Sequence, residues 1–242
     1  MLIEVCSNSL ESAINAENGG ADRIELCAEL EVGGITPSHG TLKLVLEKLS
    51  IAVFVLIRPR SGNFTYSDAE FQVMKEDIIW CKENGCSGIV SGVLNEDNSL
   101  DVERTGELIQ LSAPLPFTFH RAFDWVKEPQ RAIEELINMG CVRILTSGQQ
   151  PTAFMGMKKL CLLNERFGDR IKLMPGGGIN EDNILDFVQA GFSEIHFSAS
   201  QLVLQLKSNI PLAFNCNLYD ERYVRLTNAT KVAELVSLVK KY

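Results

Sequence analysis

An alternation of short apolar runs with longer amphipathic segments persists along the whole chain and constrains its fold more than any other feature. Apolar runs of this length, bounded by turn residues, are typical of buried strands, and the segments between them have helical periodicity. The strand candidates are Leu2–Cys6, Arg23–Leu26, Val53–Ile57, Gly88–Val90, Phe117–Phe119, Val142–Leu145, Ile171–Met174 and Glu194–Phe197. The helix candidates are Leu10–Asn18, His39–Leu49, Ser67–Glu83, Val102–Ser112, Pro129–Met139, Ala153–Phe167, Glu181–Gln189 and Asn228–Lys240.

Residues at the helix ends support these boundaries. Ser67 and Asn180 each precede acidic residues, a pattern that predicts an N-cap followed by first-turn carboxylates. Pro129 suits the first turn of its helix because the missing N–H would have no helical partner there. The residues at the helix ends therefore indicate the same boundaries as the hydrophobic periodicity.

Strands that alternate with helices run parallel, because each helix returns the chain to the same end of the sheet. Eight such units in 242 residues predict an α/β protein with a single (β/α)8 barrel, the TIM-barrel architecture. The alternative, an open doubly wound sheet, is disfavoured because no GxGxxG motif follows the first strand. We expect one domain over residues 1–242, with an irregular segment near 201–225 that forms a long loop or an extra short helix.

The amino-acid composition argues against two classes of partner, nucleic acids and membranes. The formal net charge is −8, and the 23 Lys and Arg residues form no basic block, so we expect no nucleic acid or membrane partner. The run Ile51–Ile57 is the longest strongly apolar one, far short of the roughly 20 residues that span a bilayer. The seven cysteines are odd in number and lack CxxC spacing, which indicates thiols in a reducing cytoplasm. A homodimer is consistent with the fold, but no interface is evident.

Polar side chains concentrate at the carboxyl ends of the predicted strands, where barrels of this kind carry their active sites. His120, Arg121 and Asp124 follow the fifth strand, and His196 lies in the eighth. A histidine can transfer protons near neutral pH, and an arginine can hold an anion. The alternative is that Arg121 and Asp124 form an ion pair that only stabilises their own loop.

A second group of residues predicts an anion site at the same end. Arg58 and Arg60 follow the third strand, Ser147 follows the sixth, and Gly177 and Gly178 follow the seventh. Glycines allow backbone amides to approach a phosphate, although the same residues also serve simple tight turns. We predict that the arginines, Ser147, the two glycines and His196 bind a small anion.

Acidic residues inside two short strands predict buried carboxyl groups. If Glu4 and Glu25 point into the barrel, burial raises their carboxyl pKa and suits them to acid–base work. The alternative is that an arginine across the barrel neutralises them. We expect Glu25 to pair with Arg58 or Arg60, and we assign Glu25, His120 and Asp124 as candidate catalytic groups.

Cys6 and Cys27 end neighbouring predicted strands, about 4.8 Å apart in a sheet, so their sulfurs can approach each other. Soft thiolates select Cu(I) in a reducing compartment. The alternative is inert packing, which is the usual role of buried cysteine.

Several long segments resemble the CutC family of copper homeostasis proteins. They are Ile3–Cys27, Gly33–Gly40, Ile57–Glu70, Thr118–Asp124, Arg143–Gly148 and Met174–Asn180, which follow one another over most of residues 1–200. The resemblance implies a TIM barrel, a cytoplasmic location, a role in copper homeostasis and copper binding, for which Cys6 and Cys27 are the candidates. Two hypotheses follow: a Cu(I)-binding protein, or an enzyme that acts on a small anionic or phosphorylated substrate at the barrel mouth.

Overall fold

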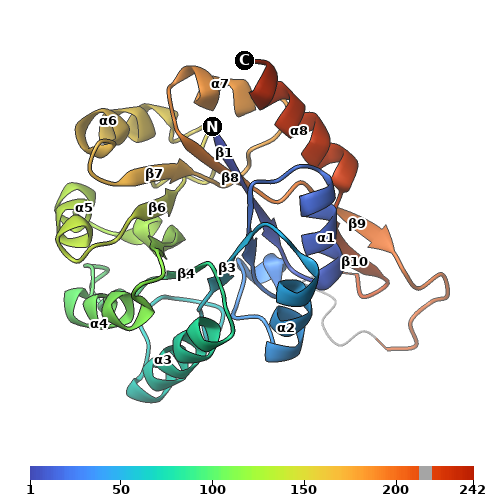
Figure 1. Ribbon diagram of the computed structural model, residues 1–242, viewed down its shortest axis with the longest axis horizontal. Coiled ribbons are helices and arrows are strands. Elements are labelled where there is room, and N and C mark those ends of the chain that lie inside the picture. The colour runs from blue at the N-terminus through green and yellow to red at the C-terminus, as the bar shows by residue number, and fades with distance from the viewer. Residues whose placement is uncertain (213–219) are drawn as a thin grey trace.

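A computed structural model describes residues 1–212 and 220–242 and confirms the predicted barrel (Figure 1). Eight parallel strands form one sheet in the order β7-β6-β5-β4-β3-β2-β1-β8. A parallel bridge between Gly176 and His196 joins the two edges and closes the barrel. The strands are β1 (Leu2–Ser7), β2 (Arg23–Leu26), β3 (Ala52–Leu56), β4 (Gly88–Ser91), β5 (Phe117–Phe119), β6 (Arg143–Thr146), β7 (Lys172–Pro175) and β8 (Glu194–Phe197).

Helices surround the sheet and follow the strands in alternation (Figure 1). They are α1 (Leu10–Asn18), α2 (His39–Lys48), α3 (Asp68–Glu83), α4 (Val102–Ser112), α5 (Pro129–Asn138), α6 (Met157–Phe167), α7 (Ile184–Gln189) and α8 (Ala229–Lys241), with short 3-10 turns η1 (Leu30–Val32) and η2 (Arg121–Trp125). Ser67 caps α3 as predicted, in a capping box with Glu70. The predicted cap at Asn180 is wrong, because α7 begins only at Ile184.

Side-chain alternation along the strands separates two interiors. Ile3 and Val5 of β1 pack in the large cluster between sheet and helices. Cys6 instead joins a small cluster with Cys27, Phe54, Leu56 and Val90 inside the barrel. The residues that line the barrel mouth at the strand ends are therefore those whose side chains point into the barrel, such as Cys6.

A buried network of ion pairs fills part of the barrel interior. Arg23 contacts Glu4 at 2.5 Å and Glu194 at 2.8 Å, and Arg143 also pairs with Glu194. All four side chains are at most 10% exposed. The network confirms that Glu4 points into the barrel, and it provides a charged layer below the mouth.

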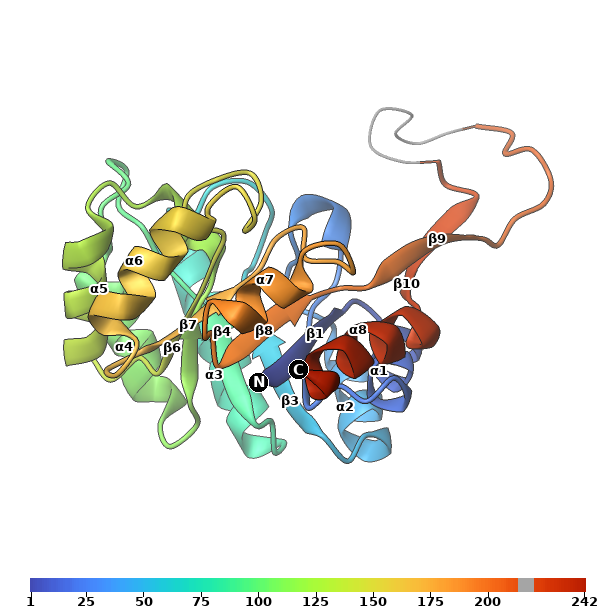
Figure 2. The ribbon, with the colours of Figure 1, turned by 90° about the horizontal axis from the view of Figure 1, so that it is seen from above.

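The segment near 201–225 differs from the loop or short helix that we expected. It contains the antiparallel strands β9 (Ser200–Leu204) and β10 (Tyr223–Thr227), which project from the barrel (Figure 2). The amides of Asn8 and Asn15 anchor the hairpin by donating to the carbonyls of Arg225 and Thr227. The part of the expected segment at 213–219, with Cys216, lies outside the described residues.

Exposed leucines mark the hairpin, including Leu202 and Leu204 of β9. Apolar side chains exposed together are typical of association surfaces, and the homodimer stays a prediction. Within the described ranges no helix has the length and apolar character needed to cross a membrane.

Candidate functional site

The candidate site is a cavity of about 250 Å³ at the carboxyl ends of the strands. Its lining combines charged, aromatic and aliphatic side chains from strand ends around the barrel. The lining residues are Cys6, Glu25, Leu30, Gly33, Leu56, Arg58, Phe64, His120, Arg121, Leu145, Gly177, Gly178, Ile179, His196, Phe197 and Ser198. The structure thus brings most of the predicted site residues to one cavity.

Two thiols lie together at the base of this cavity. The Sγ atoms of Cys6 and Cys27 are 3.7 Å apart, and both side chains are buried. The expected approach of the two sulfurs is therefore present. The neighbouring Cys27 thiol, burial and the charge of Glu25 together raise the pKa of Cys6 well above its usual value.

Glu25 and His196 complete a cluster around Cys6. Ligand atoms of Cys6, Glu25 and His196 all lie within 4.8 Å of one another, and the Cys6 thiol donates to Oε1 of Glu25 at 3.6 Å. Oε2 of Glu25 is buried and has no hydrogen-bond partner. Burial raises the pKa of Glu25. A thiol, an imidazole and a carboxyl group at this spacing can ligate a metal ion.

Glu4 orients the imidazole of His196 from the other side. Nδ1 of His196 lies 2.8 Å from Oε1 of Glu4, so its other ring nitrogen is left for Cys6 and Glu25. Burial alone would lower the pKa of His196, but Cys6, Glu4 and Glu25 raise it well above its usual value. This pairing was not predicted from the sequence, although Glu4 and His196 are partners in the β1–β8 register.

The expected ion pair of Glu25 with Arg58 or Arg60 is wrong. Arg58 donates from Nη1 and Nη2 to the carbonyls of Val32, Gly34 and Gly62, which cross-links two loops of the mouth. Arg60 turns outward and pairs with Glu70 at 2.6 Å. The guanidinium of Arg58 binds these carbonyls and not Glu25, because they belong to the loops after β2 and β3 that surround it. Arg60 is absent from the cavity lining.

His120 lies on the cavity wall as a neutral imidazole. Burial and the charge of Arg58 lower the pKa of His120 to about 3. Nδ1 accepts from the backbone N–H of Ala122 at 3.3 Å, which places the proton on Nε2. Nε2 has no acceptor in the described part of the chain. Gly92 leaves room for the ring, since a Cβ there would lie 2.8 Å from Nδ1.

Arg121 and Asp124 form the ion pair within their own loop that was expected as the alternative to a functional role. Nε of Arg121 contacts Asp124 at 2.8 Å, and Nη2 donates to the hydroxyl of Ser147. Asp124 also accepts from Thr146 and Ser147. Asp124 and Ser147 lie outside the cavity lining, whereas Arg121 reaches it.

The glycine-rich loop after β7 reaches the cavity through Gly177 and Gly178, as predicted. Gly177 has a φ of 104°, and a Cβ there would lie 3.2 Å from Nη1 of Arg121. The loop does not lead directly into a helix, because Asn183 folds back to donate to the carbonyl of Gly178. Gly177 therefore allows close packing against Arg121, and Gly178, where a Cβ would lie 3.0 Å from Cγ2 of Thr152, allows close packing against Thr152.

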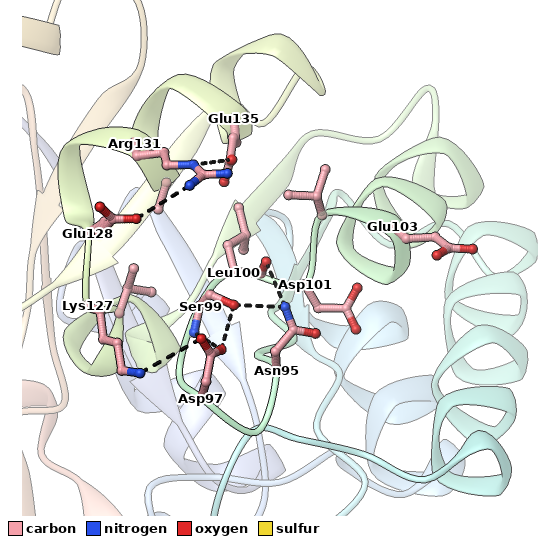
Figure 3. Close-up of a pocket in the computed structure, with 13 residues that line it drawn as sticks. Asn95, Asp97, Ser99, Leu100, Asp101, Glu103, Lys127, Glu128, Arg131 and Glu135 are labelled. Atoms are coloured by element: carbon pink, nitrogen blue, oxygen red, sulfur yellow. Dashed lines mark hydrogen bonds and ion pairs between the residues drawn. The ribbon is translucent and has the colours of Figure 1, made fainter.

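A larger hollow of about 540 Å³ lies on the outer rim, between the loop after β4 and the start of α5 (Figure 3). Its two basic side chains are paired with carboxylates: Arg131 contacts Glu128 and Glu135, and Lys127 contacts Asp97. Arg131, Glu128, Lys127 and Asp97 have largely exposed side chains. The hollow lacks the buried, unpartnered polar atoms of the mouth, so the mouth is the better candidate.

Comparisons with known proteins agree with this fold. The model of the CutC family matches residues 1–201. A Homo sapiens protein named copper homeostasis protein cutC homolog is 45% identical over 243 residues, which cover 99% of this chain and 89% of that protein. A Chromobacterium violaceum family protein CutC is 45% identical over 199 residues, 82% of this chain and 81% of that one.

Solved structures give the same result. The crystal structure of a Streptococcus agalactiae protein, described as a candidate copper homeostasis protein CutC, has a TM-score of 0.77 and 34% identity, and covers 82% of this chain and 98% of that one. A thiamine phosphate pyrophosphorylase from Pyrococcus furiosus, with a TM-score of 0.59 and 15% identity, covers 99% of this chain and 96% of that one and shows the fold alone. By sequence and by fold, the chain belongs to the CutC family of copper homeostasis proteins.

Proposed function

We propose that this protein binds Cu(I) through Cys6 and Cys27, with His196 as a third ligand. The observation that carries the proposal is the 3.7 Å separation of the two Sγ atoms beside an imidazole. Thiolates and imidazole are ligands that copper accepts, and thiolates favour its reduced state. The names of the relatives, which refer to copper homeostasis, support the same reading.

The sulfur separation favours a bent site over a linear one. With metal–sulfur bonds of about 2.3 Å, a linear bridge would need sulfurs about 4.6 Å apart, whereas the observed separation corresponds to an S–Cu–S angle of roughly 110°. A bent pair of thiolates leaves room for a third ligand. A ring nitrogen of His196 lies within 4.8 Å of the Cys6 thiol, and Glu4 fixes the ring, as carboxylates commonly do for metal-bound histidines.

Both thiols must be deprotonated when the metal binds, so binding releases protons. Cys6 lines the cavity, whereas Cys27 does not line it and is fully buried, so we expect the ion to reach the pair from the side of Cys6. The two thiols need a reducing compartment to stay reduced, and a cytoplasmic location would meet that need.

The test is an anaerobic titration with Cu(I) against a competing chelator. Wild type should bind one tightly held ion, and the double variant Cys6→Ser/Cys27→Ser should lose it. Cys161→Ser is the matched control, because Cys161 is a partly buried thiol on α6 that does not line the cavity. Equal affinity in wild type and the double variant would refute the proposal.

A second candidate function is catalysis on a small anionic molecule at the mouth. The observation that favours it is that Glu25 and His120, both buried, line the same cavity as Arg121. A carboxyl group and an imidazole can transfer a proton when a substrate lies between them. In this reaction Glu25 would take a proton from a carbon next to a carbonyl group and return it.

Proton exchange tests this second function without a known substrate. Small 2-oxo acids would be incubated with the protein in D2O, and the loss of their C3–H signals followed by NMR. Exchange by wild type but not by Glu25→Gln supports catalysis. No exchange with any acid, or equal exchange by both proteins, contradicts it.

A further inference from the structure

The mouth cavity contains a buried cation without a carboxylate partner. Arg58 is 5% exposed, and its hydrogen bonds in the described part of the chain go to the carbonyls of Val32, Gly34 and Gly62. None of the ion pairs found among the described residues includes Arg58, although burial of a charge is costly unless an opposite charge compensates it. A bound anion would supply that compensation.

Arg121 offers a donor at the same wall. Its Nε and Nη2 are engaged by Asp124 and Ser147, but Nη1 has no hydrogen-bond partner among the described residues and lies over Gly177, which also lines the cavity. The side chain of Asp124 neutralises one charge, so the pair Arg58 and Arg121 leaves this wall positive.

His120 adds a neutral donor. Its Nε2 carries the proton and has no acceptor among the described residues, and the ring is 4% exposed. A buried donor without a partner destabilises the protein, and an acceptor atom of a ligand would remove that penalty. Because burial and Arg58 lower the pKa of His120 to about 3, it donates without adding positive charge at neutral pH.

The rest of the lining is suited to a short carbon chain. Leu30, Leu56, Leu145 and Ile179 contribute apolar surface, and the cavity of about 250 Å³ has the volume of roughly eight water molecules at about 30 Å³ each. The cavity therefore accommodates a small molecule with one polar end.

We propose that the mouth cavity binds a small organic monocarboxylate, whose carboxylate accepts hydrogen bonds from Nη1 of Arg121 and Nε2 of His120 near the charge of Arg58. A phosphate dianion fits less well, because Asp124 already pairs with Arg121, which leaves one arginine charge uncompensated among the described residues of this wall, whereas the dianion carries two negative charges. The inference rests on the second candidate function in that it names its ligand class, but binding needs neither catalysis nor copper.

The test is isothermal titration of the copper-free, reduced full-length protein with butanoate, butanamide and inorganic phosphate. Butanoate should bind, whereas the neutral isostere butanamide should bind at least about tenfold more weakly, since a charged hydrogen bond contributes about 1.5–3 kcal/mol. Arg121→Gln and His120→Gln should each weaken butanoate binding about tenfold or more. Arg131→Gln on the outer rim is the matched control and should bind like wild type.

Thermal unfolding of each variant shows whether it is folded, and two variants on separate residues keep the test decisive. The proposal fails if butanoate does not bind, if butanamide binds equally well, or if both variants bind like wild type. Phosphate binding in place of butanoate overturns the assigned ligand class. Carboxylate binding without proton exchange would reject only the catalytic candidate and leave this inference standing.

Discussion

Nδ1 of His196 lies 2.8 Å from Oε1 of Glu4, and the same imidazole has a ring nitrogen within 4.8 Å of the thiol of Cys6. The contact joins the buried ion network of the barrel to the thiol cluster at its mouth, because Glu4 also binds Arg23. One carboxylate therefore serves both the stability of the barrel and the geometry of the candidate site.

We expect Glu4→Gln to weaken Cu(I) binding. Loss of a carboxylate behind a ligating histidine typically lowers metal affinity about 10–100-fold, because the ring loses its fixed orientation and basicity. Chelator competition measures the effect, and circular dichroism checks the fold. An affinity within twofold of wild type would show that Glu4 does not support the metal site.

Glu194→Gln should strongly destabilise the barrel. Glu194 is bound by Arg23 and Arg143, and removal of one partner from a buried pair leaves uncompensated charge, at a cost of about 3–5 kcal/mol. Urea unfolding gives the free energy. The matched control Glu134→Gln breaks the exposed pair with Arg170 and should cost less than about 1 kcal/mol. Equal losses in the two variants would contradict a special role for the buried network.

Acid should destabilise the protein through His120. Its pKa is about 3 in the folded state and near 6.5 when unfolded, so below pH 6.5 the unfolded state binds a proton that the native state does not. The stability that His120 contributes is thus present above pH 6.5 and is lost as the pH falls toward 3. Urea midpoints measured between pH 7.5 and 4 should fall less steeply for His120→Gln than for wild type.

Glu4 also makes the folded protein less stable as the pH falls, but over a lower pH range than His120. Burial alone would raise the pKa of Glu4, but the hydrogen bond to His196 and the charge of Arg23 lower it to about 2, so its contribution is lost between pH 4.5 and 2. Glu25 has the opposite effect: its pKa is raised in the folded state, so its protonation favours the folded state as the pH falls. The comparison of wild type with His120→Gln above pH 4.5 isolates the histidine, and identical slopes would rule out its predicted role.

Arg58→Lys should loosen the mouth. A lysine has no planar fork to hold three carbonyl groups on two loops, so we expect a loss of about 2–3 kcal/mol at roughly 1 kcal/mol for each hydrogen bond. Urea unfolding measures the loss. Arg131→Lys, which changes an exposed ion-paired arginine on the outer rim, serves as the control and should cost less. A smaller effect at Arg58 than at Arg131 would contradict the clamp.

The approach of Cys6 to Cys27 could be predicted because both residues end neighbouring strands, which lie about 4.8 Å apart in a sheet. The partners of Arg58 could not be predicted in this way. They are backbone carbonyls of loops, whose positions depend on how the chain turns after β2 and β3. The hairpin of β9 and β10 was missed for a related reason, since its half-exposed strands lack the buried apolar runs of the barrel.

By itself, the sequence determined the eightfold alternation, the closure into a barrel and the end at which the polar residues gather, since these depend on local periodicity and on the handedness of parallel connections. Only the tertiary structure decided which polar groups pair. His196 meets Glu4 across the β1–β8 contact, Arg60 turns out to Glu70, and Glu25 is left with Cys6. Pairing of this kind depends on distances of a few ångströms between residues far apart in the chain, and periodicity does not encode them.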